Sequence, residues 1–288
     1  MLTHLISSLP LKFLSRFAGL LTTRKSRWFN YFLIKSFIIF FKINLQQVSR
    51  KNLHQYKNFN DFFTRELSSE IMSQLSANDQ FCSPAEGILS EWGLIAQNQL
   101  IQAKGIYYDL GSLLGESTGF QETFEATSFM TIYLAPKNYH RVHMPMAGQL
   151  IKMAYIPGQL FPVNSWATQH IPQLFCQNER LICQFLTEKG SLIIILVGAF
   201  LVGSISTSWL GDVNPAHSLN LKIWDYQRDP IFLKQYQELG LFKYGSTVIV
   251  LFSNQTVQWK PDLKKPTNLN LGDPLATLKM HSEVCYYN

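Results

Sequence analysis

The first 60 residues of this 288-residue chain contain no aspartate and no glutamate. They hold ten lysine and arginine residues, and because the whole chain has a net charge of +6, residues 61–288 carry a net charge of −4. Charged residues are scarce overall, at 15%, whereas hydrophobic residues reach 47%. This composition excludes an intrinsically disordered chain. The length is sufficient for one large domain or two small ones.

The basic N-terminal region also lacks an apolar run long enough to cross a bilayer. Its longest stretch without lysine or arginine is Met1–Leu11, which contains His4 and Pro10, whereas a spanning helix needs roughly 20 apolar residues. The basic residues alternate with leucine, isoleucine and aromatic residues. That pattern is typical of amphipathic helices that lie on an anionic lipid surface.

The composition of this region bears on three other interpretations. So much phenylalanine and isoleucine argues against nucleic-acid binding, which needs contacts to phosphates. No small-residue cleavage site follows an apolar core, which argues against a signal peptide. A start that is free of acids and contains arginine also resembles a mitochondrial presequence, and the composition leaves this alternative open.

Cysteine is scarce and irregularly spaced. Cys82, Cys176, Cys183 and Cys285 show neither C-x-x-C nor zinc-ribbon spacing. Free thiols in a reducing compartment are therefore the simplest interpretation.

The chain shows no regular alternation of strands and helices, which argues against a doubly wound parallel sheet. Residues 4–45 are expected to form two or three amphipathic helices. From about residue 80, short apolar runs broken by glycine, proline and asparagine predict strands. The clearest runs are residues 131–135, 181–185, 192–202 and 247–252.

Two short helices are expected to interrupt these strands, near residues 108–114 and 230–239. The predicted fold class is α+β, with N-terminal amphipathic helices followed by a mainly antiparallel β core. Residues 1–60 are expected to form a membrane-associating helical region, and residues 61–288 a catalytic β-rich domain.

One segment matches the nucleophile elbow of serine hydrolases. Gly115-Glu116-Ser117-Thr118-Gly119 fits the pattern G-x-S-x-G, which requires a strand before it and a helix after it. Here a helix-like segment precedes it and an irregular polar stretch follows. The pattern alone therefore carries little weight.

A second segment, Tyr139-His140-Arg141-Val142-His143, places two histidines three residues apart. This spacing suits a metal on a helical turn, but no third cysteine or histidine lies nearby, and we predict no metal site. One histidine beside a nucleophile, oriented by a third group, would serve as a general base. Two surface histidines in a loop are the simpler alternative.

Two further segments contain turn residues beside chemically useful ones. Ser83-Pro84-Ala85-Glu86-Gly87 holds one acid within a turn. Gly245-Ser246-Thr247 opens a strongly apolar run, where either a simple turn or a reactive serine would explain it.

Together these segments, with several others, resemble the phosphatidylserine decarboxylase family. The resemblance runs in order from about residue 58 to residue 253. The segments that carry it are Phe62-Phe63-Thr64-Arg65-Glu66-Leu67, Ser83-Pro84-Ala85-Glu86-Gly87, Lys104-Gly105, Tyr139-His140-Arg141-Val142-His143, Leu160-Phe161-Pro162-Val163-Asn164, Asn178-Glu179-Arg180, Val197-Gly198-Ala199, Val202-Gly203-Ser204-Ile205 and residues 242–252.

The resemblance implies that the chain cuts itself between Gly245 and Ser246, giving a large chain 1–245 and a small chain 246–288. Ser246 would become a covalent pyruvoyl group, the cofactor of the reaction. His143 matches the base of the family, and Glu86 the acid that orients it. His140 matches a second histidine, which acts in decarboxylation or reprotonation.

The implied function is decarboxylation of phosphatidylserine to phosphatidylethanolamine through a Schiff base on the pyruvoyl group. The partners would be the phospholipid, an anionic membrane surface and the two chains of one precursor, with no nucleic acid; a homodimer stays open. Because the matching segments begin so early, we expect a peripheral protein on the cytoplasmic face of a bacterial cell membrane in preference to the mitochondrial inner membrane.

Two positions depart from the pattern of the family. Glu86 stands where aspartate is usual, and Tyr244 where leucine is frequent. The extra methylene of Glu86 changes the geometry around the base, which leaves a membrane-binding relative that does not mature as one alternative. A serine hydrolase using Ser117 is the other.

Overall fold

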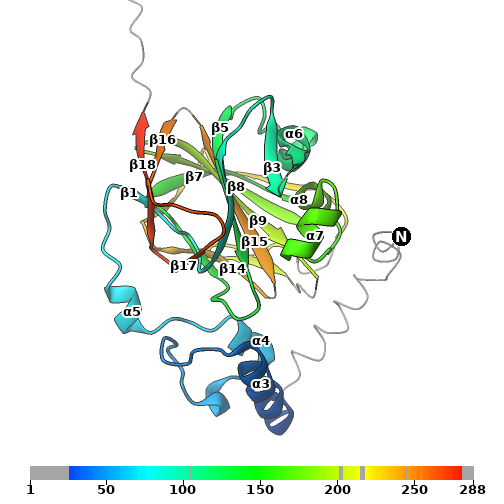
Figure 1. Cartoon of the computed structure of the whole chain (residues 1–288), viewed down its shortest axis with the longest axis vertical. Helices are drawn as coiled ribbons and strands as arrows, with labels where there is room; N and C mark the ends of the chain where they lie inside the picture. Colours follow the sequence, from blue (N-terminus) through cyan, green and yellow to red (C-terminus); the bar gives the residue numbers. More distant parts are fainter. Residues whose placement is uncertain are drawn as a thin grey trace, which may run out of the picture.

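The computed structural model describes residues 26–103, 105–200, 204–214, 218–243, 245–253 and 255–280. A β-rich body makes up most of this structure, and a smaller helical part lies at one end of it (Figure 1). The strand ladders between the named strands are antiparallel. The predicted α+β class is therefore confirmed.

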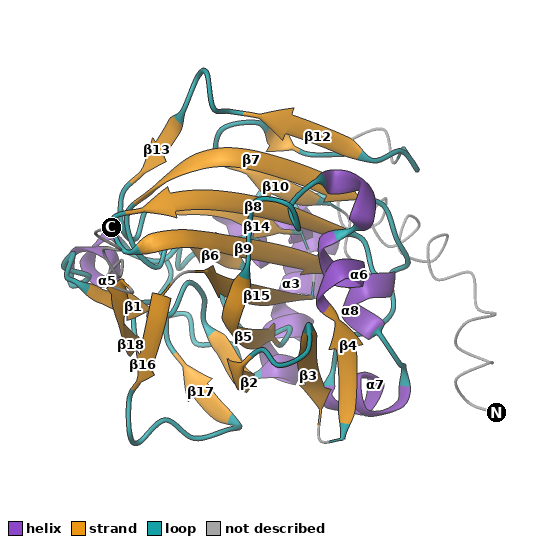
Figure 2. Ribbon diagram, turned by 90° about the horizontal axis from the view of Figure 1, so that it is seen from above, coloured by secondary structure: helices purple, strands orange, loops and turns teal. Residues whose placement is uncertain are grey.

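The main sheet contains nine strands, and Figure 2 shows most of them side by side. In order across the sheet they are β12 (Lys222–Asp225), β7 (Gly148–Ile156), β8 (Arg180–Thr187), β9 (Gly190–Gly198), β15 (Ser246–Ser253), β5 (Ala126–Leu134), β2 (Gly87–Leu94) and β17 (Thr267–Leu269), with β13 (Ile231–Leu233) also paired to β7.

Three smaller sheets accompany it. One has the order β11 (Gly211–Asp212), β10 (Ile205–Thr207), β14 (Glu238–Phe242) and β6 (Arg141–His143). Another has the order β1 (Gln80–Cys82), β18 (Pro274–Met280) and β16 (Gln255–Trp259), and a hairpin joins β3 (Gln99–Ala103) to β4 (Ile106–Asp109).

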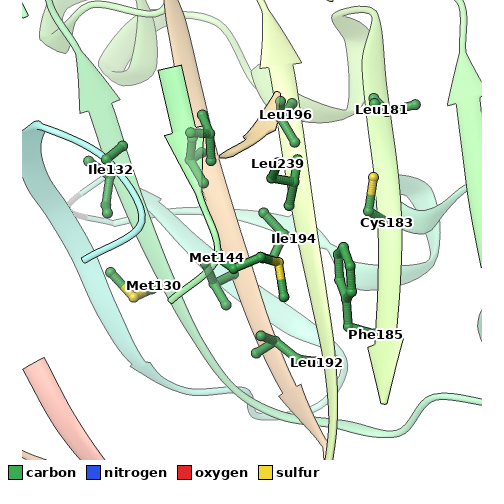
Figure 3. Close-up of a cluster of buried hydrophobic side chains, with 14 of the residues drawn as sticks. Met130, Ile132, Met144, Leu181, Cys183, Phe185, Leu192, Ile194, Leu196 and Leu239 are labelled. Atoms are coloured by element: carbon green, nitrogen blue, oxygen red, sulfur yellow. The ribbon is translucent and has the colours of Figure 1, made fainter. Parts of the chain in front are cut away.

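The central strand β15 is buried on both faces of the main sheet. Ile249 and Leu251 pack into a core that the helices cover, whereas Val248 and Val250 pack into a second core against the smaller sheets. Figure 3 shows the second core, where Leu192, Ile194 and Leu196 of β9 lie on the same face. Because both faces of the sheet are packed against other parts of the chain, the sequences of β15 and β9 are continuous apolar runs that do not alternate with polar residues.

The helices are short except for the first. They are α3 (Arg27–Phe41), η1 (Leu53–Gln55), α4 (Phe59–Phe63), α5 (Ser69–Ser73), α6 (Leu110–Leu114), η2 (Glu116–Thr118), α7 (Ser165–His170) and α8 (Leu174–Gln177). The helix expected near residues 108–114 is confirmed as α6, which begins after Asp109 because the Asp109 side chain accepts a hydrogen bond from the backbone N–H of Ser112.

The helix expected near residues 230–239 is wrong. This segment forms β13, a turn and the start of β14. Ile231 pairs with Leu150 of β7, and Glu238 pairs with His143 of β6. Pairing with two different sheets overrides the weak helix preference of the local sequence.

The N-terminal helical part packs on the β body through aromatic rings. Of the helices expected in residues 4–45, the structure describes α3, and residues 1–25 lie outside the described residues. Ile34 of α3 is buried in the same core as Phe62 and Phe63 of α4, and the Phe37 ring contacts all three phenylalanines of α4. Since α4 spans residues 59–63, it crosses the expected division between residues 60 and 61.

Candidate active site

Ser246 lies at the start of β15, in the middle of the main sheet. It pairs with Leu134 of β5 on one side and with Gly198 of β9 on the other. The residue is fully buried, and among the described residues its hydroxyl oxygen has no hydrogen-bond partner. A buried hydroxyl without a partner is costly. Within the described residues, the Ser246 hydroxyl thus forms no hydrogen bond that would stabilise the fold, which points to a chemical role.

The chain that leads to Ser246 is held on its N-terminal side. The backbone N–H of Phe242 donates to the carbonyl of His140 at 3.0 Å, and that of Lys243 donates to the carbonyl of Ser204 at 3.1 Å. The Lys243 ammonium also forms an ion pair of 2.6 Å with Asp212 of β11. Gly245 therefore lies in a short connection between two fixed strands, β14 and β15.

Side-chain packing does not explain the glycine at position 245. A Cβ atom built there would meet no atom within 4 Å, and the φ angle of Gly245 is outside the left-handed region. No steric contact with the described residues therefore requires glycine at this position.

His143 is the last residue of β6 and is buried. Its backbone N–H donates to the carbonyl of Pro84 at 2.8 Å, which joins the Glu86-bearing turn to the histidine segment. Its ring nitrogen Nδ1 lies 2.7 Å from the carbonyl oxygen of Tyr236, and Nε2 lies 2.9 Å from the hydroxyl of Tyr139. A carbonyl oxygen can only accept, so Nδ1 carries the proton and Nε2 presents its lone pair.

Burial lowers the pKa of His143 below its ordinary value of 6.5, although the Tyr236 carbonyl acts in the opposite direction. The imidazole is therefore neutral at pH 7. A neutral imidazole with its lone pair on Nε2 is in the state that a general base requires.

Glu86 does not lie against His143 as the sequence suggested. Its carboxylate accepts hydrogen bonds from the side-chain amide of Asn138 at 2.6 Å and from the backbone N–H of Tyr139 at 3.3 Å. Both ring nitrogens of His143 already have other partners. Within the described residues, Glu86 thus reaches the base only through Tyr139, whose backbone it holds and whose hydroxyl contacts the ring.

Arg65 stabilises the same loop from the other side. Its buried guanidinium donates to the carbonyls of Lys137 at 2.8 Å and Asn138 at 3.2 Å. Burial lowers the pKa of Arg65, and the negative charge of Glu86 offsets part of this effect. The negative charge of Glu86 therefore favours the charged form of Arg65 across the loop.

A cavity of about 40 Å³ lies between these two charges and the N-terminal part of the chain. It is lined by Asn44, Gln47, Val48, Arg65, Leu67, Glu86, Lys137 and Tyr139. The helical part of the chain thus contributes directly to the surroundings of Glu86.

His140 is buried beside Phe63, and the two rings stack with their centroids 4.1 Å apart. Among the described residues neither ring nitrogen has a hydrogen-bond partner, although the carbonyls of Pro136 and Ala135 favour its charged form. Burial, and then the charge of Arg65, lower the pKa of His140 to about 3. His140 is therefore neutral at pH 7.

The segment Asn178-Glu179-Arg180 supports the strand next to Ser246. The Asn178 side chain donates to the carbonyls of Gly198 and Phe161, both at 2.9 Å. A Cβ atom at position 198 would lie 2.9 Å from the side chain of Glu179, which would have to shift to make room for it. This segment therefore acts by fixing the partner of Ser246 in β9.

The described part of the chain does not form a nucleophile elbow at the G-x-S-x-G segment, in agreement with the little weight that the pattern alone carries. Ser117 is exposed in the 3₁₀ turn η2, directly after the helix α6, whereas the elbow requires a preceding strand. No group of three potential metal ligands occurs among the described residues.

Sequence reasoning missed Asn138, Tyr139 and Tyr236 as parts of this site. Tyr139 stands in the histidine segment, four residues before His143, and that proximity was a usable signal. Tyr236 is 93 residues from His143 and contributes its backbone carbonyl. Because every residue has a main-chain carbonyl, no residue type in the sequence predicts a contact of this kind.

Comparison with known proteins gives one consistent result. The sequence pattern of the family described as "Phosphatidylserine decarboxylase" matches residues 59–277. Proteins named "Phosphatidylserine decarboxylase proenzyme" are similar over nearly their whole length. The one from Coxiella burnetii is 42% identical, covering 97% of this chain and 99% of the relative, and the one from Methylococcus capsulatus is 40% identical, covering 94% of each. The one from Haemophilus ducreyi is 41% identical, covering 96% of this chain and 93% of the relative. The resemblance of the motifs is thus confirmed, and the chain belongs to the phosphatidylserine decarboxylase family.

Proposed function

We propose that this chain is a precursor that cuts itself between Gly245 and Ser246 and then decarboxylates phosphatidylserine to phosphatidylethanolamine. The observation that carries the proposal is the buried Ser246 hydroxyl, which has no partner among the described residues and directly follows Gly245 at the head of the central strand. Its relatives are named proenzymes, which supports a processed precursor.

Self-cleavage begins with attack by the Ser246 hydroxyl oxygen on the carbonyl carbon of Gly245. The hydroxyl proton passes to His143, the C–N bond breaks, and the amide becomes an ester with a free amine on residue 246. In the resting chain Nε2 of His143 faces the Tyr139 hydroxyl, so that contact must be exchanged for the Ser246 hydroxyl. A serine hydroxyl is a weak nucleophile without such a base.

The ester then eliminates. The Cα proton of residue 246 leaves, the bond between Cβ and the ester oxygen breaks, and the carboxylate of Gly245 departs as the end of the large chain. The dehydroalanine that remains takes up one water and releases one ammonia, which leaves a pyruvoyl group. The large chain ends at residue 245, and the small chain comprises residues 246–288.

The surroundings of Ser246 fit a pyruvoyl group. The group keeps the position of Ser246, where the buried side-chain oxygen has no partner among the described residues to hold it back. Once formed, the pyruvoyl group supplies an electrophilic ketone and a sink for the electrons released on decarboxylation. Among the described residues the buried nitrogens of His140 have no hydrogen-bond partner, which supports a role for His140 in holding a proton or returning one to the substrate.

Intact mass spectrometry of the purified protein tests this proposal, together with an assay of carbon dioxide release from phosphatidylserine vesicles. We expect two fragments, residues 1–245 and 246–288, and conversion of the lipid to phosphatidylethanolamine. The small fragment should resist Edman sequencing, because a pyruvoyl group has no free amine. A preparation that releases carbon dioxide but contains only the uncut chain would overturn the proposal, and an uncut, inactive chain would indicate a relative that does not mature.

We further propose that α3 holds the protein on an anionic membrane surface, such as the cytoplasmic face of a bacterial cell membrane. Large apolar side chains on α3 are exposed, with Trp28 at 75%, Phe32 at 62%, Ile39 at 68% and Phe40 at 78%. Lys35 is exposed on the same helix. Among the described helices, none has the length and apolar character to cross a membrane. An exposed apolar face with basic neighbours suits the surface of a bilayer.

Substituting this face should weaken binding to vesicles. We expect Trp28→Ser/Phe32→Ser/Phe40→Ser to lower the binding to anionic vesicles at least about tenfold, because each aromatic ring inserted into the interface gains about 1.5–3 kcal/mol. Vesicle co-sedimentation measures the effect. Binding should also weaken with added salt, because the screening length falls from about 10 Å at 0.1 M to about 3 Å at 1 M.

A matched control is Leu94→Ser/Tyr107→Ser, which removes apolar side chains exposed at 76% and 52% on the β body. This variant should bind vesicles like the parent. Deleting the whole N-terminal region is a poorer test, since Ile34 and Phe37 pack on α4 and their loss would disturb the body itself. Unchanged binding by the α3 variant would show that the membrane site lies elsewhere.

A further inference from the structure

The turn between β13 and β14 has an unusual backbone conformation beside the base. Tyr236 has a φ angle of +64°, in the left-handed region that non-glycine residues seldom adopt. The backbone N–H of Gln237 donates to the carbonyl of Lys234 at 3.1 Å, so Tyr236 is the third residue of a tight turn. A positive φ at this position is characteristic of a type II turn, which favours glycine or asparagine. Tyrosine is therefore an unusual residue at this position of the turn.

The left-handed residue is held in place by contacts at both ends. The backbone N–H of Tyr236 donates to the carbonyl of Met144 at 2.9 Å, and the backbone N–H of Met144 donates to the carbonyl of Gln237 at 2.9 Å. The Tyr236 hydroxyl donates to the sulfur of Cys82 at 3.2 Å in a buried contact. The turn is therefore fixed against the residue that directly follows His143.

This arrangement aims the Tyr236 carbonyl at the ring of His143. The oxygen lies 2.7 Å from Nδ1, and Glu86, the acid that the family pattern assigns to this task, instead binds Asn138 and the Tyr139 backbone. We propose that the main-chain carbonyl of Tyr236, presented by its left-handed backbone, fixes the tautomer of His143 with the lone pair on Nε2. Tyr236 is thus a positioning residue for self-cleavage.

The inference rests on the proposed function in one respect, because the tautomer matters only if His143 is the base. Its geometry is independent of any cleavage. A carbonyl can orient an imidazole in the same way as a carboxylate, because it accepts the Nδ1–H bond, but it brings no negative charge to stabilise an imidazolium. The role left to Glu86 is to hold Tyr139 at the other ring nitrogen.

Nitrogen NMR of the His143 ring tests the tautomer directly. The full-length Ser246→Ala chain, labelled with ¹⁵N in its histidine rings, stays uncut for the measurement, and His143→Gln assigns the signals. We expect the Nδ1–H tautomer at pH 7 in this chain. We also expect it when Glu86→Gln is added. The Nε2–H tautomer in the Ser246→Ala chain, or a switch of tautomer caused by Glu86→Gln, would overturn the proposal.

Cleavage kinetics in chains that keep Ser246 add a second readout. Glycine accepts a positive φ, so Tyr236→Gly should retain the carbonyl position and cut within about threefold of the parent rate. Valine strongly disfavours this conformation, so Tyr236→Val should cut at least about tenfold more slowly and lose the Nδ1–H signal in the uncut background. Equal cleavage rates for the valine and glycine variants would contradict the proposal. If the valine variant does not fold, the His143 tautomers measured in the Ser246→Ala chain, with and without Glu86→Gln, test the proposal by themselves. A parent chain that never cuts but shows the Nδ1–H tautomer would remove the proposed function and leave the tautomer assignment intact.

Discussion

A chain in which Ser246 is replaced by alanine is expected to remain a single polypeptide of 288 residues and to release no carbon dioxide from phosphatidylserine. The substitution removes the nucleophile, and without the ester that it forms no carboxylate can leave from Cβ to give the dehydroalanine from which the ketone is made. The residue is fully buried and pairs through its backbone with β5 and β9, so alanine leaves the strand intact. Intact mass and a circular dichroism spectrum like that of the parent establish this result.

The matched control is Ser117→Ala, at the serine of the G-x-S-x-G segment. Ser117 is exposed in a turn that lacks the strand and helix of a hydrolase elbow, so this variant should cut and decarboxylate at the parent rate. The reverse pattern, with cleavage lost in Ser117→Ala and kept in Ser246→Ala, would favour a serine hydrolase.

The second large effect is expected at His143. His143→Gln should slow self-cleavage by about 10² to 10⁴, the usual contribution of a positioned general base. Cleavage occurs once in each molecule, so the rate must be followed over time in freshly made chain. An end point after hours would hide even a large change. His170→Gln is a suitable control, because the exposed His170 ring also bonds a backbone carbonyl through Nδ1 but lies on the short helix α7, outside the sheet that holds Ser246.

The pH dependence of the same reaction follows from the burial of His143. A base acts in its unprotonated form, and burial lowers the pKa of His143 below 6.5. The cleavage rate should therefore exceed half of its maximum already at pH 6.5, reach a plateau at higher pH, and fall at more acidic pH as the imidazole becomes protonated. A rate that still rises between pH 7 and pH 9 would indicate a different base.

The sequence allowed the strands of the core to be predicted because their apolar runs are long and bounded by glycine or polar residues. Residues 247–252 and 181–185 fall inside β15 and β8. The run 192–202 was too long, since β9 ends at Gly198. The segment 230–239 was misassigned because its fate is decided by pairing with β7 and β6, which no local preference reveals.

The candidate site could be predicted as a set of segments but not as a set of contacts. The family pattern placed His140, His143, Glu86 and Ser246 in one site, and the structure joins the first three through one loop and the backbone of Pro84. The family pattern did not predict that Glu86 binds Tyr139, because a carboxylate has many partners of suitable chemistry within reach. Nor did the family pattern predict the contact of the Tyr236 carbonyl with His143, since every residue has a main-chain carbonyl.

The place of β15 in the sheet has a consequence for the order of events in the life of the molecule. β15 follows most of the chain in sequence, yet it lies between β5 and β9 in the middle of the main sheet. If cleavage occurs after residue 245 as proposed, the reacting bond is assembled only after β15, residues 246–253 of 288, has been synthesised and inserted between strands made earlier. A truncated or misfolded chain could not activate itself. Only a chain that has assembled its main sheet could therefore become active. After cleavage the large and small chains would still share that sheet, so separating them would require denaturing it.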